Sequence, residues 1–230
     1  TPRMRDGSAD VSFVGSAIAM LKEQKIVVIK STVPPGTTEY FQKKYPHYRV
    51  LFNPEFLTEQ NAWEQTLNPD RQLVGWTVRS KKCAARVLAL LPQAPIMAPS
   101  DEFNVSATEA EIIKYGANIF LARKVTFANA LYDLAKHHGM NYESIRAGLS
   151  TDPRIGSSHL NVHHGGYRGY GGYCFVKDTD AFIAHAKKQG LHHVAELISA
   201  DARFNTKVLA TQGLTPEDVA VHDWELNQES

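Results

Sequence analysis

Apolar side chains in the first part of the chain follow two alternating spacings. Over residues 11–22 they recur every three or four positions, as on one face of a helix, and residues 25–29 then form a short apolar run typical of a buried strand. Helix and strand patterns continue to alternate, which implies right-handed crossovers and a parallel sheet. We therefore predict an α/β fold over residues 1–102, corresponding to about half of a Rossmann-like parallel sheet. Further strands are predicted at 49–52, 72–76 and 96–97, with one helix ending near Lys44 and another over 81–91.

Beyond residue 102 the pattern becomes helical. Ser106 and Glu109 have the spacing of a capping box, and helical periodicity then continues as far as Gly139. We predict one long helix here, within an all-α domain over residues 103–230. Shorter helices are predicted at 141–149, 179–188 and 194–209, and a last one begins at Thr215.

One of the two cysteines lies in a glycine-rich segment, residues 169–178. Glycines in a flexible loop would leave backbone N–H groups open, and Lys177 would bring an ammonium close to Cys174. Both features favour the thiolate, which is the nucleophilic form of the side chain. Cys174 is therefore a candidate nucleophile, whereas Cys83 lies on the apolar face of a predicted helix and is expected to be a small core residue.

Two polar side chains on the predicted long helix point from the same face. Lys114 and Asn118 are spaced i and i+4, so they lie one turn apart. A solvated helix face is the ordinary explanation for such a pair. Alternatively, an ammonium and an amide on one helix wall could stabilise an oxyanion next to the cysteine.

Acidic and hydroxyl side chains follow the first two predicted strands, at the end where open α/β sheets bind ligands. Glu55 and Glu59 would share a helix face if a helix began at Pro54. There they would either favour the helix dipole or supply a general base for water. Thr32 follows the preceding strand and either contacts a cofactor or caps the next turn.

Histidines close to the glycine-rich segment have a spacing that does not favour zinc. His159, His163 and His164 lack the tight pairs typical of structural zinc sites, so we predict no metal. Residues 165–170 superficially resemble an Arg-Gly-Gly RNA-binding tract. A single arginine in a neutral protein does not predict nucleic-acid binding.

Composition narrows the class of protein further. The 230 residues carry a net charge of +1, from 25 basic and 24 acidic side chains, and 43% of them are hydrophobic. Such a chain has no strong positive electrostatic potential to attract nucleic acid or an anionic membrane. No apolar run approaches the roughly 20 residues that a membrane helix requires. The N-terminal segment is polar and the cysteines are far apart, so we expect a cytoplasmic protein with reduced thiols.

Six segments occur in an order that is similar to one enzyme family. They are 30–34 (KSTVP), 53–57 (NPEFL), 68–71 (NPDR), 114–118 (KYGAN), 152–156 (DPRIG) and 169–178 (GYGGYCFVKD). Together they resemble the UDP-glucose 6-dehydrogenase branch of the UDP-glucose/GDP-mannose dehydrogenase family. The resemblance implies a partial Rossmann-like NAD-binding domain followed by a helical dimerisation domain that carries the catalytic cysteine.

The resemblance also implies a reaction, the twofold NAD-dependent oxidation of a nucleotide-sugar C6 alcohol to a carboxylate, with UDP-glucose as the first choice of substrate. Cys174 would hold the aldehyde as a thiohemiacetal and then as a thioester. Glu55 would activate water, and Asp178 and a water bound to Thr32 would assist proton transfer. By the same resemblance, the oxyanion would be stabilised by Lys114 and Asn118, and the cofactor would be bound by Thr32, Glu59 and Lys177. The substrate would be bound by Glu55, Phe56, Leu57, Lys114, Asn118, Arg154, Tyr170 and Gly171. Of these, Arg154 would reach the site of a partner subunit.

The sequence departs from the family pattern in three places. It contains no Gly-x-Gly-x-x-Gly turn to place the pyrophosphate of NAD on a helix N-terminus. The family's C-terminal domain, which closes over the UDP half, is also missing, and residues 163–166 lengthen the substrate loop. We therefore expect a chain truncated at both ends, which forms a homodimer through the long helix at 106–138. A second chain is one way to complete the NAD-binding domain and to cover the strand at 25–29.

Two other hypotheses remain open. The chain could be a catalytically incomplete remnant that acts as a binding or structural assembly protein. Alternatively, the chemistry could be the same with GDP-mannose or UDP-N-acetylmannosamine as the substrate.

Overall fold

The structure is a computed structural model that describes residues 1–58, 61–101 and 103–220. It divides into two compact units, residues 1–116 and 117–230, and the division falls inside one long helix. The first unit mixes helices with strands and the second is helical, so the predicted combination of an α/β and an all-α part is confirmed. The boundary at 102/103 stays a prediction. The helices of the first unit are α1 (Ser12–Ala19), α2 (Thr37–Lys44), α3 (Ala62–Leu67), α4 (Lys81–Leu88) and the beginning of α5 (Ala107–His137).

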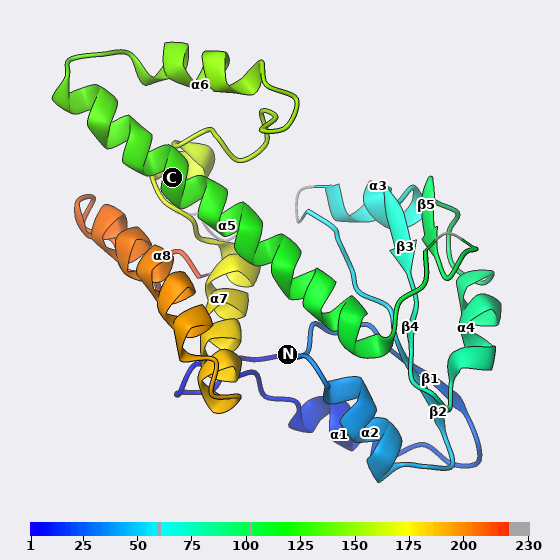
Figure 1. Ribbon diagram of the computed structural model, residues 1–230. Coiled ribbons are helices and arrows are strands. Elements are labelled where there is room, and N and C mark those ends of the chain that lie inside the picture. Colours follow the sequence, from blue (N-terminus) through cyan, green and yellow to red (C-terminus); the bar gives the residue numbers. More distant parts are fainter. Residues whose placement is uncertain (59–60, 102, 221–230) are drawn as a thin grey trace. The chain divides into compact units, whose positions relative to one another are not determined.

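Short strands form two small sheets in the first unit (Figure 1). β1 (Ile26–Ile29) runs parallel to β2 (Arg49–Phe52), and β2 runs antiparallel to β4 (Gly75–Trp76). β3 (Arg71–Leu73) and β5 (Ile96–Ala98) form a separate parallel pair. The predicted parallel pairing is confirmed for β1 with β2 and for β3 with β5. The single strand predicted at 72–76 is wrong, because this segment divides into β3 and β4, and β4 pairs antiparallel.

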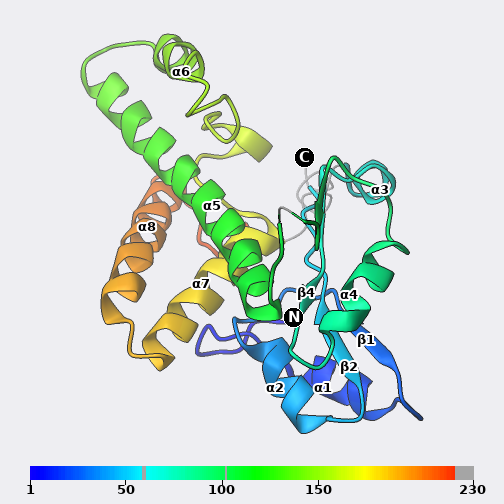
Figure 2. The same cartoon turned by 45° about the vertical axis from the view of Figure 1, so that its right-hand side comes forward.

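Successive residues of β2 pack on opposite faces of its sheet. Phe52 belongs to a core cluster with Phe41 of α2, while Leu51 belongs to another cluster with Ala84 of α4. Helices α1 and α2 lie on one side of the strands and α4 on the other (Figure 2). Because β1 and β2 are parallel, their carboxyl ends meet at one edge, which displays the segments that follow Ile29 and Phe52.

The second unit consists of packed helices. Helices α7 (Gly172–Lys188) and α8 (His192–Ala210) lie side by side, joined by a three-residue turn at 189–191 (Figure 1). This unit also contains α6 (Tyr142–Ser150) and the 3-10 turn η2 (His164–Gly166).

The predicted capping box at the start of α5, in the first unit, is confirmed. The backbone N–H of Ser106 donates to Glu109 Oε2 at 2.6 Å, and that of Glu109 donates to Ser106 Oγ at 3.3 Å.

Three local predictions are wrong. The helix predicted from residue 179 begins instead at Gly172, so Cys174 lies in the first turn of α7 and not in a loop. No helix begins at Pro54, since residues 53–58 belong to no helix or strand. Residues 216–219 form a turn in place of the predicted last helix, although Thr215 and Asp218 exchange the hydrogen bonds of a capping box. Among the described residues, no helix is both long and apolar enough to cross a membrane.

Candidate active site

Cys174 is the third residue of α7 and is exposed to solvent. Two glycines stand at the start of the helix, and the first of them has no room for a side chain. A Cβ atom on Gly171 would clash with Tyr167 Oη and lie 2.8 Å from Val219 Cβ, and the N–H of Gly172 donates to the carbonyl of Val219 at 2.7 Å. The first turn of a helix presents unpaired N–H groups and favours a negative charge. The thiol therefore lies where a thiolate would be stabilised.

A buried polar network lies one helical turn after the cysteine. Asp178 is fully buried, and its Oδ2 accepts a hydrogen bond of 2.6 Å from Nδ2 of Asn118 on α5. Its Oδ1 forms an ion pair with the ammonium of Lys177, which is 7% exposed. The cation predicted beside Cys174 is thus bound to a carboxylate. A carboxylate held by both partners can orient the amide of Asn118, which keeps a second N–H donor.

The segment before α7 is fixed by Asn205 of α8. The backbone N–H of Tyr170 donates to Asn205 Oδ1 at 2.7 Å, and Asn205 Nδ2 donates to the Tyr170 carbonyl at 2.9 Å. Burial raises the pKa of the Tyr170 phenol well above its usual value, so the side chain stays neutral. The predicted substrate residues Tyr170 and Gly171 therefore lie next to Cys174 in a well-anchored backbone.

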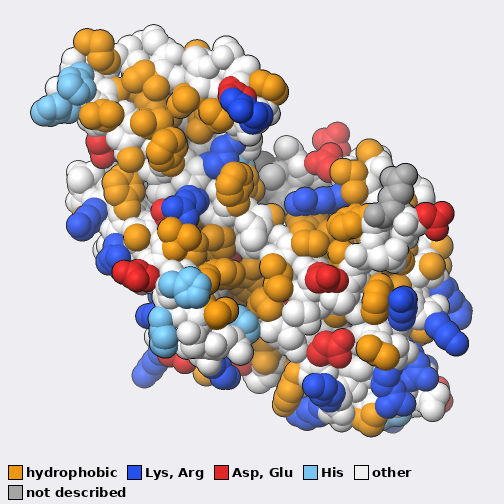
Figure 3. Space-filling view, viewed as in Figure 1, with side chains coloured by type: hydrophobic (Ala, Val, Ile, Leu, Met, Phe, Trp, Pro, Cys, Tyr) orange, Lys and Arg blue, Asp and Glu red, His pale blue; other side chains and the backbone are white. Residues whose placement is uncertain are grey.

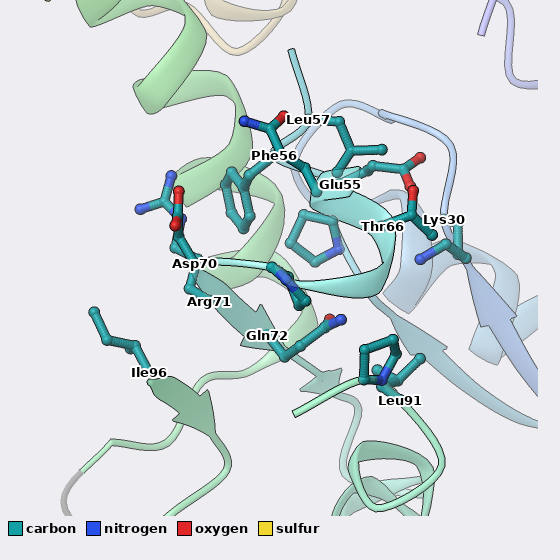
Figure 4. Close-up of a pocket in the computed structure, with 14 residues that line it drawn as sticks. Lys30, Glu55, Phe56, Leu57, Thr66, Asp70, Arg71, Gln72, Leu91 and Ile96 are labelled. Atoms are coloured by element: carbon teal, nitrogen blue, oxygen red, sulfur yellow. The ribbon is translucent and has the colours of Figure 1, made fainter. Parts of the chain in front are cut away.

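In the first unit, predicted site residues gather at the carboxyl ends of β1 and β2. Glu55, Phe56 and Leu57 line a cavity of about 370 Å³, which Lys30 borders from the end of β1 (Figure 4). The edge is cross-linked by the fully buried Asn53, whose amide donates to the carbonyl of Leu73 at 2.8 Å and whose Oδ1 accepts from Lys30 Nζ at 2.8 Å. The remaining lining residues are Pro54, Gln65, Thr66, Pro69, Asp70, Arg71, Gln72, Leu91, Pro92 and Ile96.

The ring of Phe56 contacts two cations. The Arg71 guanidinium lies 3.7 Å from the ring centroid, and the Lys114 ammonium lies 5.7 Å from it. Burial lowers the pKa of Arg71, and the charge of Asp70 opposes this effect. Lys114 is only 7% exposed, so the solvated-face explanation does not describe its surroundings. The ring therefore helps to hold an ammonium at low exposure.

The predicted site residues fall into two groups, one in each unit. Lys114 and Asn118 lie one turn apart on α5, on either side of the division between the units. Arg154 is exposed and pairs with Asp152 through a contact of 2.6 Å. Glu59 lies outside the described residues. The first unit holds Thr32, Glu55, Phe56, Leu57 and Lys114, and the second holds Asn118, Arg154, Tyr170, Gly171, Cys174, Lys177 and Asp178.

The sequence reasoning missed two buried polar residues that hold these groups. Glu111 is fully buried on α5 and bonds to the start of α2, and Asn205 is 2% exposed and binds the Tyr170 backbone. Glu111 follows Ala107 and Ala110 on the apolar face of the helix, and an acid there is a signal that could have been noticed. Among residues 1–58, 61–101 and 103–220, no cluster of three or more His, Cys, Asp or Glu could hold a metal ion.

Two models of one family match this chain. Residues 1–93 match the UDP-glucose/GDP-mannose dehydrogenase family, NAD binding domain, and residues 108–207 match the central domain of that family. The match to the NAD binding domain indicates NAD as the cofactor.

Individual relatives agree with the family models. The chain is 36% identical to UDP-glucose 6-dehydrogenase TuaD of Bacillus subtilis, over 90% of this chain and 45% of that protein. It is 33% identical to UDP-glucose 6-dehydrogenase of Rickettsia typhi, over 94% of this chain and 48% of that protein. The structure of a UDP-glucose dehydrogenase from the archaeon Pyrobaculum islandicum matches with a TM-score of 0.75 and 35% identity, over 89% of this chain and 48% of the other. The chain thus spans about half the length of these relatives.

Proposed function

This chain belongs to the UDP-glucose/GDP-mannose dehydrogenase family, and we propose that it acts as a nucleotide-sugar dehydrogenase of the UDP-glucose 6-dehydrogenase type. The proposed reaction is the twofold oxidation of a C6 alcohol to a carboxylate. One observation carries the proposal. An exposed thiol in the first turn of α7 lies one turn from a buried Asp178 that binds both Asn118 and Lys177.

Cys174 would retain the partly oxidised sugar on the protein. Its sulfur adds to the C6 aldehyde produced by the first oxidation, which forms a carbon–sulfur bond and a thiohemiacetal. NAD, when bound, provides the acceptor for the hydride that leaves C6 in each oxidation. The second oxidation converts the adduct into a thioester on Cys174. Water then cleaves the carbon–sulfur bond, which releases the carboxylate and restores the thiol.

The polar side chains have separate tasks in this proposal. The Lys114 ammonium and the Asn118 amide would stabilise the developing oxyanion. Glu55 is exposed at the cavity and would take a proton from the water that attacks the thioester. Asp178 and a water bound to Thr32 would assist proton transfer. Phe56, Leu57, Tyr170 and Gly171 would contact the sugar nucleotide.

The first unit fits one end of NAD better than the other. The cavity at the carboxyl edge is lined by both apolar and polar side chains, which suits a planar nicotinamide ring with its carboxamide group. Thr32 and Lys177 are proposed to bind the cofactor. The N-terminus of α2, in contrast, is already bound by the carboxylate of Glu111 and is not available for the pyrophosphate. We infer that additional polypeptide, for example from a second chain, supplies the pyrophosphate site.

The outer edge of β1 supports this inference. Within the described residues, β1 pairs on one side only, and Ile26 is 40% exposed. An unpaired strand edge with apolar side chains is a template for another strand. The same additional polypeptide would cover it.

A homodimer is the proposed assembly, with the second copy packed on the later part of α5. Phe120, Phe127 and Leu134 are spaced seven residues apart and are 64%, 60% and 56% exposed. Such spacing places the three side chains on one face of the helix, and Figure 3 shows hydrophobic side chains gathered over the region of α5. Phe127→Glu is expected to convert the dimer to a monomer in sedimentation velocity experiments. A dimer that survives this change would place the interface elsewhere. Arg154 is proposed to reach the partner's substrate.

A second candidate function is binding or assembly without turnover. Two observations favour it: the occupied N-terminus of α2 and the exposed apolar stripe of α5. Under this hypothesis the chain binds a nucleotide sugar or a partner and reduces no NAD.

The deciding experiment measures NADH absorbance with the purified chain, NAD and one nucleotide sugar at a time. UDP-glucose is expected to give the highest rate, ahead of GDP-mannose and UDP-N-acetylmannosamine. Cys174→Ala should abolish turnover, while Cys83→Ala, the matched control at the other free cysteine, should leave it unchanged. Absence of turnover in a folded wild-type dimer would favour the binding role or an enzyme that needs further polypeptide to bind NAD. Turnover that survives Cys174→Ala would exclude the covalent route.

A further inference from the structure

Glu111 makes contacts that the proposed chemistry does not use. Its side chain is fully buried on α5, and it accepts three hydrogen bonds from the start of α2. Oε2 accepts from the N–H of Gly36 at 2.6 Å, and Oε1 accepts from the N–H and the hydroxyl of Thr38 at 2.8 and 2.6 Å. No side chain of the preceding residue caps α2. A glutamate from another helix therefore provides the cap.

The segment held in this way carries Thr32. Between Thr32 and Gly36 lie Pro34 and Pro35, whose rings fix the backbone dihedral φ. The turn is closed by Thr37, whose hydroxyl and N–H both donate to the carbonyl of Pro34, at 2.6 and 3.1 Å. Gly36 has φ of +88°, a conformation that glycine adopts without strain. Few backbone torsion angles are therefore free between Thr32 and the residues of α2 that Glu111 binds.

Glu111 also lies one turn before Lys114 on α5. A single helical segment thus carries the group that fixes the Thr32 turn and the ammonium that contacts Phe56. We propose that Glu111 is a positioning residue, which holds the Thr32 turn in register with Lys114 by binding the first N–H groups of α2. This inference builds on the proposed dehydrogenase function, because the importance of Thr32 and Lys114 comes from it.

The charge state of Glu111 affects the strength of this connection. Burial is the main cause that raises the pKa of Glu111 to about 7, and the charge of Glu39 on α2 adds to this increase. The hydrogen bonds from Thr38 and Gly36 lower the pKa of Glu111 and offset part of the increase. Lys114 is the cation one turn away on α5 itself. The ionised carboxylate can accept from all three donors, whereas the protonated acid must direct its own O–H at one of them.

The test uses hydrogen exchange of the backbone amides, which does not depend on turnover. Glu111→Gln should speed exchange at Gly36 and Thr38 at least tenfold, with exchange in α7 unchanged. Corrected for intrinsic rates, protection of these amides in the wild type should change as the pH passes through 7, and this dependence should disappear in Glu111→Gln. Glu196→Gln, the same substitution at an exposed position of α8, is the control and should change neither.

Kinetics then separate positioning from simple stability. If the wild type turns over, Glu111→Gln should lower kcat at least tenfold and change the KM for the nucleotide sugar by less than twofold. Thr38→Val, which removes only the hydroxyl contact, provides a second variant if Glu111→Gln does not fold. Unchanged exchange at both amides in a folded variant would overturn the inference. A wild type without turnover would remove the dehydrogenase function, while the exchange result would still decide whether Glu111 fixes the turn.

Discussion

Two buried carboxylates, one in each compact unit, are stabilised by different means. Asp178 in the second unit lies against the ammonium of Lys177 and the amide of Asn118, so a cation balances its charge. Glu111 in the first unit binds two backbone N–H groups and one hydroxyl, which are all neutral. Neutral donors offset only part of the cost of burying a charge, and burial raises the pKa of Glu111 to about 7. The first unit thus contains a contact that changes near neutral pH.

The largest effect is expected from breaking the pair in the second unit. Asp178→Ala leaves the Lys177 ammonium buried without its carboxylate, and removing one partner of a buried ion pair typically costs about 3–5 kcal/mol. Urea unfolding at pH 7 would measure the loss. The double variant Lys177→Met with Asp178→Ala should recover part of it, because no unpaired charge remains. A loss below about 1 kcal/mol for the single variant would mean that solvent reaches Lys177.

The carboxylate of the first unit should instead give a pH-dependent effect. The pKa of Glu111 is raised in the folded state, so its contribution to stability is present below the unfolded value of 4.5 and is lost as the pH rises to about 7. The wild type should therefore lose up to about 3 kcal/mol relative to Glu111→Gln between these limits, at 1.36 kcal/mol per pKa unit. Urea unfolding of both proteins from pH 4.5 to 8 would measure the difference. Parallel pH profiles would contradict the assigned pKa.

An uncharged contact in the first unit offers a further comparison. A Cβ atom on Gly75 of β4 would lie 2.7 Å from Ala110 Cβ and 2.8 Å from the carbonyl oxygen of Ser106. Gly75→Ala should therefore destabilise by about 1–3 kcal/mol, as overpacked cores do. Gly148→Ala is the matched control, because no atom lies within 4 Å of its Cβ position, and an alanine in a helix should be neutral or stabilising. Equal unfolding midpoints for the two variants would show that β4 can move away from α5.

The features that the sequence predicted correctly depend on local patterns. The length of α5 and its capping box follow from residue spacing alone, and the alternation of elements predicted the α/β class of the first unit. The start of α7 was missed because glycines normally disfavour helix, and a carbonyl from Val219, far along the chain, satisfies the N–H of Gly172.

The candidate site shows the same limit. Motif resemblance pointed to Cys174, Asn118, Lys177 and Asp178, and the structure brings Asn118, Lys177 and Asp178 into contact; their catalytic roles stay predictions. Glu111 was not identified because its partners lie 73 to 75 residues away, in a turn that no periodicity connects to α5. A buried acid on an apolar helix face could be found from sequence, but not the groups that it binds.

The smallest effect isolates one hydrogen bond of Glu111. Thr38→Val keeps the shape of the side chain and the backbone N–H but removes the hydroxyl that donates to Oε1 at 2.6 Å. A hydrogen bond to a charged group contributes about 1.5–3 kcal/mol and one to a neutral group about 1 kcal/mol. The cost measured by urea unfolding should therefore be larger at pH 8, where Glu111 is ionised, than at pH 5.5. If the cost is the same at both pH values, the hydroxyl does not distinguish the two charge states of Glu111, and the two backbone N–H groups alone would respond to its ionisation.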